Sequence, residues 1–586
     1  MMSRRRKRRE KPAPEARRAR LVAEAAGHTL QSHAVGALPL INGILERLSL
    51  RQCLEEMLPE EDERVVIPAA TGLLVLVKNV LLSREALYGV ADWSVLKAPD
   101  LVGLTSEQID GFNDDRMGRC LDRLFDADCG SVALRAAASA VREFQVSLDE
   151  LHNDSTTVTF HGAYANAKEE QTVRGRRTKA ITWGHNKDHR PDLKQVLYIL
   201  TVTEDGAVPV QFRVESGNTT DDQTHQATWD VLCQLSGRRD FLYVADSKLA
   251  TRENMAYIHQ RGGRFLSVLP QTRSEDGAFR QALAEDKVTW RHLWDKADED
   301  GKVFDRFSVS DFASTSSDGY RLVWYHSTLK AELDALARGG QLERLLQQLA
   351  ALRQKLLSPR TRYRTESRVR DAIDRLLKDE EAVAHLVEVR LEPREQESYR
   401  QASRGRPTSK TRYVREVTTQ FDLGYNVNQE ALELERKADG IFPLITNEFH
   451  ASERDLLWAY KKQPRIEKRF SQLKTDFLVA PMHLQSASRI EAFLCVYFLA
   501  LLVEALLERE LRRAMAAAKV KSLPLYPEGR ACECPTAPRV FEVFDNVQRH
   551  RLEMDEQPPT VLVTQLSPLQ RTILKLLRQA PETYGR

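Results

Sequence analysis

The stretch KQVLYILTVTEDGAVPVQFRVE, residues 194–215, decides how this sequence folds. Apolar and β-branched residues fill both of its halves, and the dipeptide Asp205-Gly206 between them is a strong signal for a tight turn. The stretch therefore predicts two antiparallel strands, 194–203 and 207–215, joined as a hairpin. A third strand is expected at 150–160 (ELHNDSTTVTF), which has the same β-branched, alternating character.

The residues after the hairpin alternate between helix and strand. Periodicity predicts helices over 221–235 and 252–260, and buried strands over 241–246 and 264–269. Three strands, helix, strand, helix, strand is the order of an RNase H-like core, so the expected fold class is α/β. The order is lost after Pro270, and we interpret residues 271–436 as a large α+β insertion into this core.

The chain is expected to consist of six segments, because its length is too great for one core. Helical periodicity, which is clearest at 69–82, extends from 36 to 144 and predicts an N-terminal helical region. Its short helices and polar turns allow a helix-turn-helix, so we expect this region to bind DNA ends or to dimerise. The segments are a basic disordered arm (1–30), the helical region (31–145), the first part of the core (146–270), the insertion (271–436), the second part of the core with a Glu-bearing helix (437–515), and a C-terminal helical tail (516–586).

Charge is unevenly distributed along the 586 residues. Lys and Arg number 87 and Asp and Glu number 84, for a net charge of +3. Residues 1–20 alone hold ten basic residues against Glu10 and Glu15, a net of +8, so the remaining residues sum to −5. The arm is either a solubilising tail or a contact to phosphates.

Composition places the protein in an aqueous, reducing compartment. Hydrophobic residues at 42% and charged residues at 29% are typical of folded soluble chains. Seven cysteines without a CxxC pair argue against a disulfide framework or a zinc ribbon. The longest apolar run leaves twelve uncharged residues, Ala492–Val503, too few for a bilayer, so a core helix and no membrane partner are expected. We predict a cytoplasmic, nucleoid-associated protein.

Two acids stand at or near strand ends where they could share a metal ion. Asp154 lies in the first strand and Asp246 ends the strand 241–246. Carboxylates on adjacent buried strands can hold hard cations that activate water and stabilise the leaving oxygen of a phosphodiester. A third acid should come from a helix packed beside them, and Glu467 is the candidate.

The residues around these acids resemble a known family. The spacing Tyr460-x2-Gln463-x3-Glu467-x6-Lys474, with the strings around Asp154 and Asp246, resembles the DDE transposases of the insertion-sequence 4 group, whose hallmark is Y-x2-R-x3-E-x6-K. The stretch 184–195 (GHNKDHRPDLKQ) further resembles the insertion-sequence 1634 branch.

The resemblance implies a chemistry and a set of residues. Asp154, Asp246 and Glu467 would be catalytic and hold Mg²⁺, with Mn²⁺ as a possible substitute. The enzyme would bind the ends of its element, cleave phosphodiester bonds by two-metal-ion catalysis and join 3′-OH ends to target DNA. Its partner would be double-stranded DNA, on which it would form a homodimer. The predicted DNA-binding residues are Tyr460, Gln463, Arg465, Lys474, Lys187 and Arg190.

The sequence departs from the family pattern at Gln463, which stands where the family has Arg and so removes a charge from a phosphate contact. Pro464 suits a first helical turn, so Tyr460 is expected to precede the helix that carries Glu467. Two alternatives stay open: an RNase H-like nuclease without strand transfer, and a non-catalytic DNA-binding relative of transposases.

Overall fold

The computed structural model describes residues 22–25, 28–298, 300–358, 361–480, 482, 484–554 and 557–584. Contacts divide the chain into two compact units, the first made of Met1–Ser267 and Leu457–Arg586 and the second of Val268–Leu456. Most of the predicted basic arm, residues 1–21 and 26–27, lies outside the described residues.

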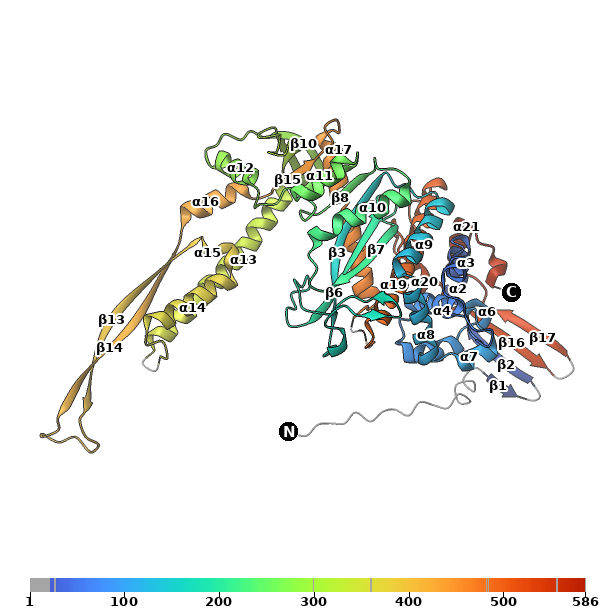
Figure 1. Cartoon of the computed structure of the whole chain (residues 1–586), viewed down its shortest axis with the longest axis horizontal. Coiled ribbons are helices and arrows are strands. Elements are labelled where there is room, and N and C mark those ends of the chain that lie inside the picture. Colours follow the sequence, from blue (N-terminus) through green and yellow to red (C-terminus); the bar gives the residue numbers. More distant parts are fainter. Residues whose placement is uncertain are drawn as a thin grey trace. The chain divides into compact units, whose positions relative to one another are not determined.

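Helices occupy residues 38–144 of unit 1, ahead of the central sheet (Figure 1). The prediction is wrong for Val22–Ala25 and His28–Ala34, which form strands and not a disordered arm or a helix. The helix expected at 69–82 is confirmed, and nearly all of its residues are buried because it is apolar on every side. The helices are α2 (Leu38–Arg47), α3 (Leu50–Met57), α4 (Ala69–Leu82), η1 (Leu87–Gly89), α5 (Val90–Val95), α6 (Pro99–Val102), α7 (Ser106–Gly111), α8 (Asp114–Asp126) and α9 (Cys129–Phe144).

The strands of unit 1 form a mixed sheet in the order β9-β8-β3-β6-β7. The central strand β3 pairs antiparallel with β6 and parallel with β8. The predicted hairpin is confirmed, and Gly206 in its turn has a φ of +84°, which favours glycine. The elements are β3 (Glu150–Phe160), η2 (Ala165–Ala167), β4 (Thr172–Val173), β5 (Arg176–Arg177), β6 (Lys194–Thr203), β7 (Pro209–Ser216), η3 (Asp221–Thr224), α10 (His225–Ser236), β8 (Leu242–Ala245), α11 (Arg252–Gln260) and β9 (Arg264–Val268).

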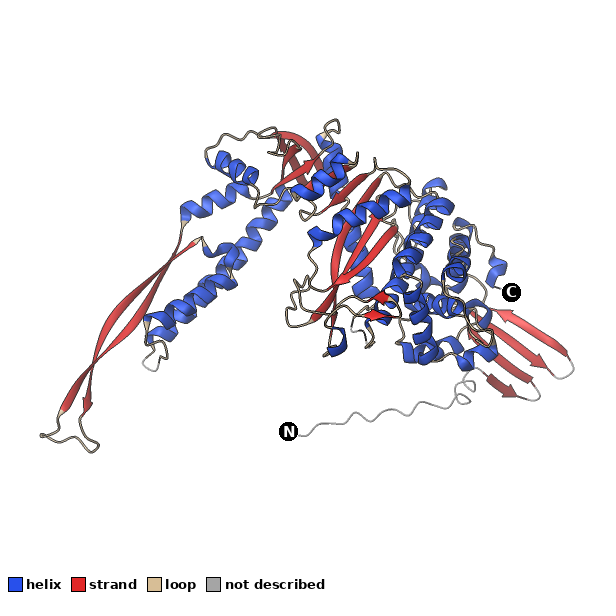
Figure 2. Cartoon of the chain, viewed as in Figure 1, coloured by secondary structure: helices blue, strands red, loops and turns tan. Residues whose placement is uncertain are grey.

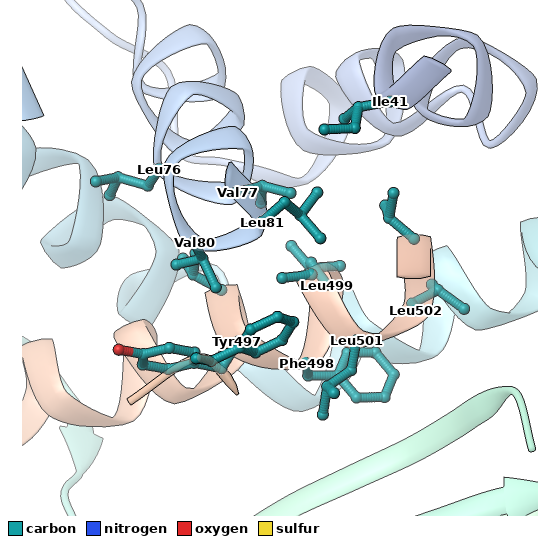
Figure 3. Packing of buried hydrophobic residues seen from close by; sticks show 14 of the residues in the cluster. Ile41, Leu76, Val77, Val80, Leu81, Tyr497, Phe498, Leu499, Leu501 and Leu502 are labelled. Carbon is teal, nitrogen blue, oxygen red and sulfur yellow. The ribbon is translucent and has the colours of Figure 1, made fainter. Parts of the chain in front are cut away.

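The chain after unit 2 supplies the helices that complete the core. They are α17 (Glu453–Lys461), α18 (Pro464–Ser471), a π-helix η4 (Gln472–Asp476) and α19 (Ala487–Ala517). Helix α19 packs against α4, α8, α9 and β7. Figure 3 shows its residue Leu499 next to Val77 and Leu81 of α4, while Phe498 stacks on Phe212 of β7.

Helix α19 is long and apolar enough to cross a membrane by length and composition, and it is the one such helix among the described residues. In this structure 89% of its most apolar window is buried inside the protein. It is therefore the core helix that the sequence predicts.

The predicted helical tail, 516–586, is wrong in part because the segment also contains two strands. These strands, β16 (Gln548–Met554) and β17 (Gln557–Val563), continue a sheet of order β1-β2-β16-β17. Strands β1 (Val22–Ala25) and β2 (His28–Ala34) come from the N-terminal part of the chain, so this pairing joins segments about 500 residues apart and leaves no local signal. The helical elements of the segment are α20 (Ala537–Phe544), α21 (Pro568–Leu576) and η5 (Pro581–Tyr584).

Unit 2 combines a four-stranded antiparallel run, β10-β11-β12-β15, with helices and a long two-stranded hairpin, β13–β14 (Figure 2). The strand expected at 439–447 is present as β15, and it pairs with β12 in this unit. The elements are α12 (Ser274–Ala284), β10 (Arg291–Ala297), β11 (Val303–Ser310), β12 (Arg321–Ser327), α13 (Thr328–Leu357), α14 (Glu366–Asp379), α15 (Glu381–Ala384), β13 (Val387–Gln401), β14 (Tyr413–Val427), α16 (Gln429–Ala438) and β15 (Ile441–Thr446).

A buried acid in α19 makes the stability of unit 1 depend on pH. Glu504 is 1% exposed, and burial, together with the nearby Glu508 carboxylate, raises its pKa to about 8. The folded state thus keeps a proton that the unfolded chain loses near pH 4.5, so stability falls as pH rises towards 8.

We expect Glu504→Gln to remove this dependence, because the amide is neutral at every pH. The melting temperature of the variant relative to the wild type should rise between pH 5 and pH 8 and then level off, as measured by thermal scans. Glu107→Gln, at an exposed position in α7, is the control and should leave the profile unchanged. A constant difference between Glu504→Gln and wild type at all pH values would contradict this account.

Candidate functional site

Two of the three predicted acids lie side by side on neighbouring strands. The parallel register of β3 and β8 ends with Asn153 opposite Ala245, so Asp154 and Asp246 occupy the next positions on the two strands. Neighbouring strands lie about 5 Å apart, and residues in register point to the same face of a parallel sheet. The fold thus brings together two carboxylates that are 92 residues apart in sequence.

The surroundings of this pair disfavour two negative charges. Burial, and then the charges of Asp246 and Asp221, raise the pKa of Asp154 to about 6, against the pull of Lys187. Burial also raises the pKa of Asp246, and Asp221 adds to the effect. Acids with raised pKa values in a polar cluster are typical of functional sites, where a bound cation can relieve the repulsion.

Lys187 places its ammonium group among these acids. Its Nζ lies 3.0 Å from Asp221 Oδ2 and 3.5 Å from Asp154 Oδ1. It also donates hydrogen bonds to the carbonyl and hydroxyl oxygens of Ser155, at 2.8 and 2.7 Å. Burial acts to lower the pKa of Lys187, but the two carboxylates outweigh it, so the pKa is raised. Lys187 is therefore a cation held inside the acidic cluster.

Asp221 is a member of the cluster that the sequence analysis missed. It stands at the start of η3, and its Oδ1 accepts a hydrogen bond of 2.7 Å from the Ser155 hydroxyl. An Asp-Asp pair at the start of a helical stretch is the common signature of a helix N-terminus, so nothing in the local sequence marks Asp221 as special.

Glu467 lies on helix α18, but it does not complete a ligand set. Pro464 opens α18 as predicted, and Tyr460 lies in the preceding helix α17. Burial first, and then the charges of Asp246, Glu467 and Asp154, raise the pKa of Tyr460, so all three acids act on this one hydroxyl. Within the described ranges, no three His, Cys, Asp or Glu side chains are close enough together to hold one metal ion.

Gln463 is built into the protein interior. Its side chain is buried, its Nε2 donates to the carbonyl of Asn153 at 3.1 Å, and its Oε1 lies 2.9 Å from His152 Nδ1. Since both ends of the amide are engaged with β3, Gln463 fastens the start of α18 to the strand that carries Asp154.

The remaining predicted DNA-binding residues lie in surface ion pairs. Lys474 Nζ lies 2.6 Å from Asp188 Oδ1, and Arg190 pairs with Asp192 at 2.7 Å. Arg465 donates to the carbonyl of Glu204 at 2.7 Å. The DNA contacts of these residues and of Tyr460 and Lys187 stay predictions.

The cluster has the donor type, though not the spacing, that a hard divalent cation needs. Asp154, Asp246 and Asp221 offer only carboxylate oxygens, which are the ligands that Mg²⁺ and Mn²⁺ prefer. The ammonium group of Lys187 already lies where positive charge is favoured.

Comparisons with known proteins place few constraints on this chain. A family described as a domain of unknown function, DUF4277, matches residues 30–137, the helical region before β3. No curated protein matches. Among solved structures, the chain is similar to the piggyBac transposase in a synaptic complex with hairpin DNA, with a TM-score of 0.24 and 8% identity. The similarity covers 48% of this chain and 63% of that one, and it is too distant to assign any residue a role.

The burial of Gln463 generates a prediction that separates a structural role from DNA contact. Gln463→Ala leaves the Asn153 carbonyl and His152 without their partner, so we expect the free energy of unfolding to fall by about 1–3 kcal/mol. The control Arg465→Ala removes a half-exposed ion pair two residues away and should cost no more than about 1 kcal/mol. Urea unfolding measures both. Unchanged stability in Gln463→Ala, together with weaker DNA binding, would instead make Gln463 a DNA contact.

Proposed function

We propose that this chain is a DDE-type transposase of the insertion-sequence 4 group, in its 1634 branch, built on an RNase H-like core. The observation that supports the proposal best is the pair Asp154 and Asp246 on neighbouring parallel strands, with Glu467 on a helix fastened to the same strand. The spacing of Tyr460, Gln463, Glu467 and Lys474, which resembles the motif of the insertion-sequence 4 group, supports the proposal independently of the geometry.

In this proposal the acidic cluster holds divalent metal ions. Asp154, Asp246 and Glu467 would hold them through their carboxylate oxygens. Bound Mg²⁺ or Mn²⁺ would activate a water molecule and stabilise the charge on the leaving oxygen of a phosphodiester.

The chain's own residues have distinct roles in the proposed reaction. At neutral pH the Asp154 carboxyl is mostly ionised, since its pKa of about 6 lies below 7. It can therefore serve as a negatively charged ligand. The hydrogen bonds of Lys187 to Ser155 keep its ammonium group beside the site. From there it can replace its ion pair with Asp154 by a charge-assisted hydrogen bond to a phosphate oxygen of the DNA. Tyr460 lines the same cluster. DNA ends and target DNA are the proposed substrates, and a homodimer the proposed assembly, in a cytoplasmic, nucleoid-associated protein.

The proposal predicts that each of the three acids is essential for cleavage. Metal-ion stabilisation of a transition state is worth several kcal/mol, so Asp154→Asn, Asp246→Asn and Glu467→Gln should each lower DNA cleavage by about a thousand-fold or more. The measurement is cleavage in Mg²⁺ and in Mn²⁺ of a duplex that carries the inverted repeats flanking the gene, with DNA binding followed in parallel and expected to persist.

Asp240→Asn is the matched control, because Asp240 is an exposed acid just before the opposite end of β8. It should cleave like the wild type. Full cleavage by any of the three variants would contradict the assignment of that residue. A second assay supplies a pre-cut 3′-OH end and a target plasmid. A transposase joins the two, whereas a nuclease without strand transfer does not.

A further inference from the structure

Unit 2 contains a two-stranded ribbon that the catalytic proposal does not use. Strands β13 and β14 pair over their full 15 residues, from Val387 opposite Val427 to Gln401 opposite Tyr413. At about 3.3 Å per residue, the hairpin is about 50 Å long. That length exceeds one turn of a DNA duplex, about 34 Å.

Only the base of this hairpin is packed against the rest of unit 2. Val387, Phe421 and Leu423 are buried in a core cluster with leucines of α13, including Leu349. At the end of this packed part, Asp422 forms ion pairs with Arg394 at 2.7 Å and with Arg353 of α13 at 2.8 Å.

The distal part of the hairpin, residues 397–416, which we name the basic ribbon, has no such support. Within it, residues 397–400 and 412–416 are exposed on both faces of the two strands. Figure 2 shows the tip of the ribbon lying apart from the helices of its unit. A two-stranded ribbon without a covered face is at best marginally stable in water, so a partner that covers it would stabilise it.

The charge of the basic ribbon identifies the kind of partner. The basic ribbon contains six basic residues, all between 400 and 415, and two acidic residues at its ends, Glu397 and Glu416. Within the part of the chain that the structure describes, Arg415 is paired with Glu397, and the other five have no ion-pair partner. These five are Arg400, Arg404, Arg406, Lys410 and Arg412. Charges that merely protect strand edges can be of either sign, whereas a net charge of +4, six basic minus two acidic residues, fits a polyanion.

The side chains of the ribbon are arranged for contact on both faces. Alternation along the strands places Tyr399, Tyr413 and Arg415 on one face, and Arg400 and Val414 on the other. Tyr399 is 64% and Tyr413 53% exposed, which is unusual for large aromatic side chains without a partner. Tyr hydroxyls and Arg guanidinium groups are both common donors to phosphate oxygens.

We propose that the basic ribbon is a DNA-binding arm that lies in a groove of the duplex. The major groove, about 12 Å wide, admits a two-stranded β-ribbon. Arg400 and Arg415 lie on opposite faces of the strands, and the other four cations lie in the loop 402–412 at the tip, where they would meet the phosphates. The inference rests on the proposed function only for its choice of DNA as the polyanion. It does not involve the acidic cluster.

The test is the salt dependence of duplex binding by the full chain, measured in EDTA so that cleavage does not enter. In the variant R400Q/R404Q/R406Q/K410Q/R412Q, five phosphate contacts are lost. The slope of log affinity against log salt should therefore become shallower by about 4–5, at about 0.9 per contact. Circular dichroism checks that the variant is folded.

The matched control replaces five exposed basic residues elsewhere in unit 2, as K302Q/K355Q/R368Q/R375Q/K378Q, with the same change in net charge. It should change the slope by less than about 1. Equal slopes in the ribbon variant and wild type, or equal losses in ribbon variant and control, would overturn the proposal. So would a ribbon variant that binds DNA normally but loses self-association in sedimentation or binding to anionic vesicles. Because duplex binding is measured without metal, the two proposals are tested independently. A negative result for the basic ribbon says nothing about cleavage, and a negative cleavage result says nothing about the basic ribbon.

Discussion

The arrangement of the site depends on one buried guanidinium group. Arg469 is 2% exposed, and it donates to the carbonyl oxygens of Gly206 and Ala207 in the β6–β7 turn while its Nη1 lies 3.1 Å from Glu508 of α19. A buried charge is tolerated only when it is fully paired, and removing one partner from such a network typically costs about 3–5 kcal/mol. Arg469 lies two residues after Glu467, so the same contacts that satisfy it fix α18 against the sheet.

A second constraint acts on the other end of that helix, where Gln463 bonds to the backbone of β3 beside Asp154. Asp154 of β3, Asp246 directly after β8 and Asp221 of η3 form a cluster whose mutual repulsion is only partly relieved by Lys187. We propose that a divalent cation would relieve this repulsion further. Burial, and then the charges of Asp246, Glu467 and Asp154, raise the pKa of Tyr460. Glu467 is therefore the acid of α18 that lies near the cluster.

The sequence predicts the elements of the sheet well because their signals are local. The strands 150–160 and 194–203 and the helix 252–260 coincide with β3, β6 and α11, and the order of strands brings Asp154 and Asp246 together as expected. What the sequence hides is pairing at long range. The sheet of β1, β2, β16 and β17 joins the two ends of the chain, and the burial of Gln463 depends on contacts with a strand over 300 residues away. Asp221 has the local pattern of an ordinary helix start. The β13–β14 hairpin lies in the segment that the sequence analysis treats only as an insertion, and no regular alternation marks its full length.

We propose that the acidic cluster is a metal site in which Lys187 occupies the place of a divalent cation. A crystal structure of the full chain grown with Mn²⁺, with anomalous diffraction recorded to locate the metal, tests this most directly. The account predicts manganese bound to carboxylate oxygens of both Asp154 and Asp246, with the ammonium group of Lys187 moved away from Asp154. Manganese absent from the cluster at millimolar concentration, with Lys187 still beside Asp154 and Asp221, would contradict it.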